Sequence, residues 1–86
     1  LGPALAEDEL TLGPTDFAIL AVQLTAIPRN GSYGSQLTEE LWRDLATWRP
    51  DLALTAYKSA LGSHFFNMSW LMPLTAIMQT IEENKR

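Results

Sequence analysis

The sequence SALGSHFFNMSWLMPLTAIMQTI, residues 59–81, contains no Asp, Glu, Lys or Arg. It holds two of the three phenylalanines and all three methionines, so it supplies a large share of the apolar volume available for a core. A membrane span needs about 20 predominantly apolar residues, whereas polar residues, a glycine and a proline interrupt this stretch. We therefore expect buried helical segments that the preceding residues cover, and no membrane span.

Length and composition indicate one small folded domain. The chain has 86 residues, of which 47% are hydrophobic and 19% charged, as in globular proteins. Cysteine is absent, which excludes disulfides and thiolate metal sites. We expect a flexible N-terminal tail over residues 1–13 and a single helical domain over 14–86. The first residues lack the basic start and apolar run of a secretory signal, so a cytoplasmic setting is expected.

Two prolines bracket the first predicted helix, residues 17–27. Pro14 suits an early helical position, Thr15 or Asp16 can cap free amides, and Pro28 ends the helix. Apolar side chains cover almost its whole circumference, so we expect this helix to be enclosed on several sides. Its β-branched residues leave a buried strand as the alternative.

The second predicted helix follows the glycine-containing loop at residues 29–36. Ser35 or Thr38 can cap it, and Pro50 stops it. Trp42 lies beside its apolar stripe, either at the edge of the core or as an exposed anchor for another chain. The stripe is made of Leu37, Leu41, Leu45 and Trp48.

Two further helices are expected in the rest of the chain. One opens at Asp51 and either ends near Gly62 or continues through residues 65–72. The last begins at Trp70 or Pro73 and reaches Glu83. Its apolar stripe is Leu74, Ile77, Met78 and Ile81. The sequence therefore predicts an all-α fold, a small bundle of four or five short helices.

Residues suited to catalysis are sparse. His64 is the single histidine, and Ser63 beside it points elsewhere on a helix. A Ser-His-Asp arrangement of Ser63 or Ser69 with His64 and Asp51 can be written, but no recognisable motif supports it. We expect no enzyme activity and no cofactor. A metal site would depend on carboxylates alone, so none is expected.

A helix-turn-helix regulator is the alternative function. The second helix, the WRPD turn at residues 48–51 and the helix after it could form a helix-turn-helix in which the helix after Pro50 faces DNA. The run YGSQL at residues 33–37 resembles the start of PadR-type winged-helix repressors. Phosphate contacts need clustered Lys and Arg. The net charge of −4 and the balance of charges between Arg29 and Lys58 argue against nucleic acid as a partner.

A carrier-protein-like domain is the lesser alternative. The run GSQLTEEL around Ser35 resembles the Asp-Ser-Leu site at which acyl and peptidyl carrier proteins receive phosphopantetheine. Gly34 stands where the Asp should be, and Gln36 stands where the Leu should be.

A protein–protein interaction or assembly module accounts best for the uncharged segment. A small bundle leaves part of such a segment exposed, and contiguous apolar exposure marks contact surfaces. The expected partner-binding residues are Trp42, Phe66, Trp70 and Met72. The expected partner is another protein chain or a second copy of this one. The competing interpretation is that all of this segment is ordinary core.

Overall fold

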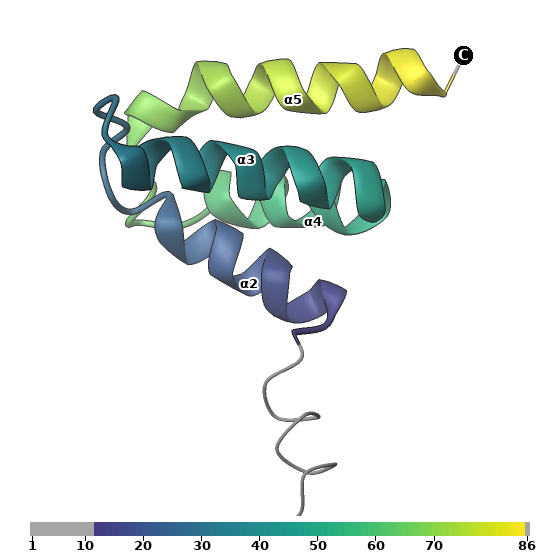
Figure 1. Cartoon of the computed structure of the whole chain (residues 1–86), viewed down its shortest axis with the longest axis horizontal. Coiled ribbons are helices and arrows are strands. Elements are labelled where there is room, and N and C mark those ends of the chain that lie inside the picture. Colours follow the sequence, from purple (N-terminus) through teal and green to yellow (C-terminus); the bar gives the residue numbers. More distant parts are fainter. Residues whose placement is uncertain (1–11, 86) are drawn as a thin grey trace, which may run out of the picture.

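The computed structural model describes residues 12–85, which fold into four α-helices without a strand (Figure 1). The helices are α2 (Pro14–Leu24), α3 (Tyr33–Trp48), α4 (Pro50–Leu61) and α5 (Leu71–Asn84). A single 3₁₀ turn, η1 (Met68–Trp70), leads into α5. The predicted all-α bundle is thus confirmed. Most of the expected N-terminal tail, residues 1–11, lies outside the described residues.

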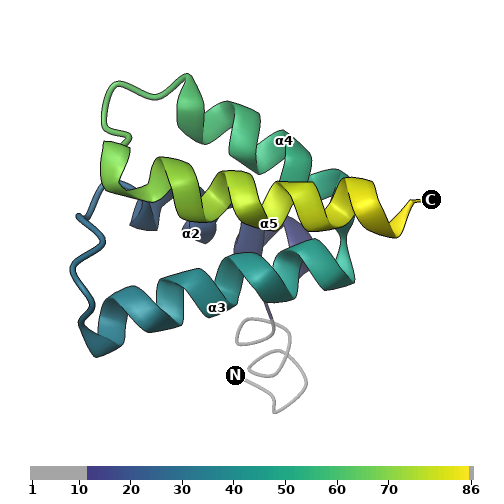
Figure 2. The same cartoon turned by 90° about the horizontal axis from the view of Figure 1, so that it is seen from above.

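Helices α3 and α4 form the middle of the bundle. Helix α2 packs on both of them, and α5 packs on both from the opposite side (Figures 1 and 2). The chain reverses direction between α2 and α3 and again between α3 and α4, so α2 and α4 run in roughly the same direction (Figure 1).

Prolines and short polar side chains set the helix ends. Pro50 begins α4, one residue before the expected start, and Arg49 alone separates α3 from α4. Gly62 caps the end of α4, so the apolar residues that follow at helical spacing do not belong to the same helix. Pro73 occupies the third position of α5, where a backbone N–H has no partner within the helix.

Two helix ends differ from the sequence prediction. Helix α2 ends at Leu24 instead of Ile27, because the next N–H groups make tighter bonds to carbonyls three residues back. Helix α3 begins earlier than expected, since Ser32 is its N-cap and accepts a 3.1 Å hydrogen bond from the Ser35 N–H.

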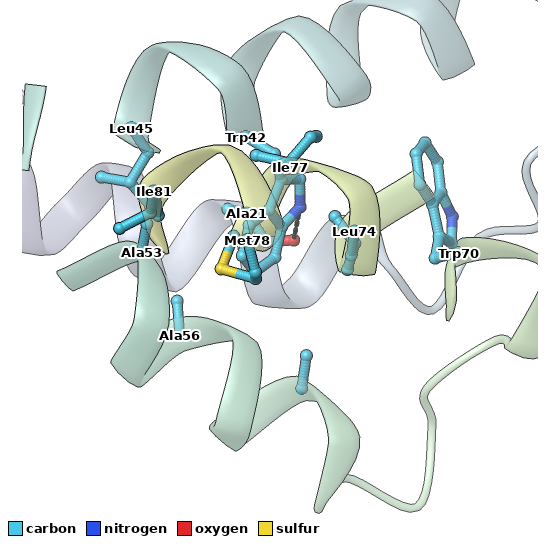
Figure 3. Packing of buried hydrophobic residues seen from close by; sticks show 11 residues of the cluster. Ala21, Trp42, Leu45, Ala53, Ala56, Trp70, Leu74, Ile77, Met78 and Ile81 are labelled. Atoms are coloured by element: carbon cyan, nitrogen blue, oxygen red, sulfur yellow. Dashed lines mark hydrogen bonds between the residues drawn. The ribbon is translucent and has the colours of Figure 1, made fainter. Parts of the chain in front are cut away.

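The core lies between the helices and is centred on Trp42 (Figure 3). The expected α5 stripe is confirmed, because all four of its residues are buried. Helix α4 contributes three alanines, and such small side chains let its neighbours approach closely. The buried hydrophobic residues are Ala21, Trp42, Leu45, Ala53, Ala56, Ala60, Trp70, Leu74, Ile77, Met78 and Ile81.

The expected stripe of α3 is half right, because Leu45 is buried and Leu41 is partly buried against the core. Leu37 and Trp48 are exposed, and Trp48 packs edge-on against Phe17 with ring centroids 5.6 Å apart. The buried residues of α3 are Leu45 and three residues outside the expected stripe, Ser35, Thr38 and Trp42. On this face the Trp42 indole N–H donates a 3.1 Å hydrogen bond to the Ala21 carbonyl of α2 (Figure 3).

Three hydrogen bonds join the α2–α3 connection to the segment that precedes α5. The Trp70 indole N–H donates to the Ile27 carbonyl over 2.6 Å, and the Asn67 N–H donates to the Thr25 carbonyl over 2.8 Å. The Arg29 N–H donates to Ser69 Oγ over 2.7 Å. These bonds link residues about 40 positions apart and hold the chain segments together at one end of the bundle.

Candidate functional site

The four expected partner-binding residues do not lie on one surface. Trp42 and Trp70 are buried in the core of the chain itself, and Phe66 is half-buried against that core. Met72 is 82% exposed on α5. By helical spacing it points away from Leu74 and Ile77. The two tryptophans therefore act as core residues whose indole N–H groups bind backbone carbonyls.

Helix α2 carries exposed apolar side chains although it packs against two other helices. Its residues from Phe17 to Val22 are all apolar, yet α3 and α4 cover it from one side. Ile19 remains 52% exposed and Leu20 38% exposed. A helix that is apolar all round is normally buried all round. Among residues 12–85, the expectation that this helix is enclosed on several sides is therefore not met.

An apolar hollow of about 400 Å³ lies between α2 and α4. Its walls combine small and branched side chains with three hydroxyls, and they include Ala18, Ile19, Val22, Leu52, Ala56 and Ser59. A second hollow of about 200 Å³ continues from it, because Val22 and Gln23 line both. Phe65, itself largely exposed, lines the second hollow. We call these two hollows and the exposed side of α2 the α2–α4 face.

Among the described residues, no Asp, Glu, Lys or Arg lines either hollow of the α2–α4 face. Most described charges are paired elsewhere. Glu39 accepts hydrogen bonds from Arg29 over 3.0 Å and from Arg43 over 2.6 Å. The Arg43 hydrogen bond, aided by that of Arg29, outweighs partial burial and lowers the pKa of Glu39 from its ordinary value of 4.5.

A second ion pair stands at the start of α4. The Arg49 guanidinium donates two hydrogen bonds to the Asp51 carboxylate, over 3.0 and 2.8 Å. These bonds lower the pKa of Asp51 and raise that of Arg49. At the other end of the chain, Lys85 lies 3.7 Å from Glu82. These ion pairs place four basic side chains beside carboxylates: Arg29, Arg43, Arg49 and Lys85. Because their charges are offset there, they form no basic patch that would support the helix-turn-helix alternative.

The structure does not assemble the Ser-His-Asp arrangement. Asp51 lies in the first turn of α4, whereas Ser63 and His64 follow its last turn, and a helix of this length extends roughly 18 Å. The Ser63 hydroxyl accepts a hydrogen bond from the Phe65 N–H. Within residues 12–85, no three His, Asp or Glu side chains come together as a metal site.

Ser35 is placed poorly for modification. Its side chain is buried, and its hydroxyl accepts a 3.3 Å hydrogen bond from the Asn30 N–H. A serine that carries a phosphopantetheine arm must reach an enzyme in solution, so the carrier-protein alternative gains no support.

Sequence reasoning missed the α2–α4 face. Its signal is the continuous apolar run of α2, which by itself predicts only that this helix is enclosed on several sides. Ile19 and Phe65 stand out only once the packing of α2 on α3 and α4 is known.

No family model, no curated protein and no solved structure matches this chain. In the part of the chain that the structure describes, no helix is both long enough and apolar enough to cross a membrane.

Proposed function

We propose that this chain is a non-enzymatic protein–protein interaction module that buries its α2–α4 face against a partner chain. The observation that carries the proposal is the incomplete cover of α2, a helix apolar around its circumference that the bundle packs from one side. Exposed apolar surface beside a hollow is a common feature of protein contact sites.

The gain from covering this face is appreciable. Full burial of an isoleucine side chain contributes roughly 1.5–3 kcal/mol, so covering the exposed half of Ile19 contributes about 1 kcal/mol. Apolar side chains of the partner would enter the two hollows beside Ile19. No charged side chain lines these hollows, so none has to lose its contact with water. Phe65 extends the contact beyond the end of α2, so Ile19 and Phe65 take the place of the expected binding residues Trp42, Phe66, Trp70 and Met72.

The proposal is tested by capture with matched variants. The wild-type protein, Ile19→Asp and Met72→Glu are immobilised and exposed to an extract of the native host, and retained proteins are quantified. Met72 is an exposed apolar residue on α5, so it serves as the control for adding a carboxylate to the surface. We expect partners that the wild type and Met72→Glu retain and Ile19→Asp loses. Equal retention by all three proteins would refute the proposed function.

Circular dichroism of each variant separates a loss of binding from a loss of folding. Ile19 and Met72 are both exposed, so neither substitution should change the helical signal.

A further inference from the structure

The α2–α4 face is suited to contact with a second copy of this chain. Two-fold contact brings each surface against itself, so a chain with a net charge of −4 associates most easily through a surface whose centre is uncharged. Among the described residues, both hollows of this face meet that condition.

The charges beside the hollow complement one another under a two-fold axis. Asp16 is exposed next to Thr15, which lines the hollow near the start of α2. Lys58 is exposed next to Ser59, which lines it near the end of α4. Because α2 and α4 run in roughly the same direction (Figure 1), the acid and the base stand toward opposite ends of the hollow. A two-fold axis that lies in the contact plane and crosses α2 and α4 places the Asp16 end of one copy beside the Lys58 end of the other.

The shape of the α2–α4 face also allows two copies to fit together. Ile19 is half-exposed beside a hollow lined by Ala18 and Ala56. Small side chains on the walls leave room for a branched side chain from outside.

We propose that two copies of this chain associate through their α2–α4 faces around a two-fold axis, with Ile19 of each copy in the hollow of the other. The Asp16 and Lys58 side chains then form two ion pairs at the rim of the contact. This inference rests on the proposed function and specifies its partner.

The test is the molar mass of the full chain, measured by sedimentation and light scattering over a range of concentrations. We expect the wild type and the control Met72→Glu to pass from one chain to two as concentration rises. Ile19→Asp should weaken the dimer about a hundredfold, because it places a carboxylate in each of two apolar hollows.

Charge exchange at the rim tests the two-fold arrangement itself. Asp16→Lys and Lys58→Glu should each weaken the dimer about fivefold, and the double variant Asp16→Lys/Lys58→Glu should restore it. Independent losses that add in the double variant would overturn the arrangement.

A wild-type chain that stays single up to about 1 mM would overturn association of two copies. The proposed function would still be decided by the capture experiment, since a different partner lost with Ile19→Asp would support it there. A dimer that Ile19→Asp leaves intact would overturn the proposed contact.

Discussion

Replacing Trp42 by phenylalanine should destabilise the fold far more than the same replacement at Trp48 on the same helix. Trp42 is completely buried, and its indole N–H donates to the Ala21 carbonyl over 3.1 Å. In a continuing α-helix the Thr25 N–H would reach that carbonyl, but it donates to the Val22 carbonyl instead. Phenylalanine leaves the Ala21 carbonyl without its indole partner and leaves a space where the larger ring was.

The two losses can be estimated separately. A buried acceptor deprived of its donor costs about 1–3 kcal/mol, and the smaller ring costs a further 1–2 kcal/mol or so. We therefore expect Trp42→Phe to lower the free energy of unfolding by about 3 kcal/mol. For a domain of this size, that loss lowers Tm by roughly 12–24 °C.

Trp48→Phe provides the matched control. The Trp48 side chain is half-exposed and contacts Phe17 through an edge, so its replacement should cost about 0.5 kcal/mol. Urea unfolding followed by far-ultraviolet circular dichroism measures both variants. Equal destabilisation by the two substitutions, or an unchanged stability of Trp42→Phe together with a loss of partner capture, would refute the core role of Trp42.

Four further substitutions test local features of the fold. Gly31→Ala should lower the free energy of unfolding by about 1–2 kcal/mol, because Gly31 has φ = +78°, which an alanine adopts only with strain. Gly34→Ala, in the first turn of α3, should raise the free energy of unfolding by up to about 1 kcal/mol. Thermal unfolding compares the two variants. Glu39→Gln should lower stability by about 1 kcal/mol at neutral pH. The folded-state pKa of Glu39 is lowered, so its contribution is present above pH 4.5 and disappears as the pH falls through the folded value. A difference from wild type that persists in acid would contradict this cause. Asn67→Ala should lower the free energy of unfolding, measured in denaturant, by about 1 kcal/mol. The reason is that the Asn67 side chain accepts a hydrogen bond from the Ser69 N–H at the start of η1. An unchanged free energy of unfolding would show that this cap is dispensable.

The sequence by itself determined that the fold is helical and several of the helix limits, but it left open whether the helix after Pro50 ends near Gly62. Pro14, Pro28, Pro50 and Pro73 restrict where a helix begins or ends, because proline lacks an N–H and clashes with the preceding turn. The buried stripe of α5 could also be predicted, since its apolar residues recur at helical spacing between polar ones. These signals act over a few residues, so they are visible in the chain alone.

Tertiary structure alone decided which side of α3 is buried and which side of α2 stays uncovered. The buried face of α3 includes a hydrogen bond between Trp42 and Ala21, which are 21 residues apart. Helix α2 is apolar on nearly every side, so its sequence carries no information about the direction of its neighbours. The candidate face containing Ile19 therefore follows from the packing of α2 on α3 and α4, because exposure depends on what covers a side chain and not on the side chain itself.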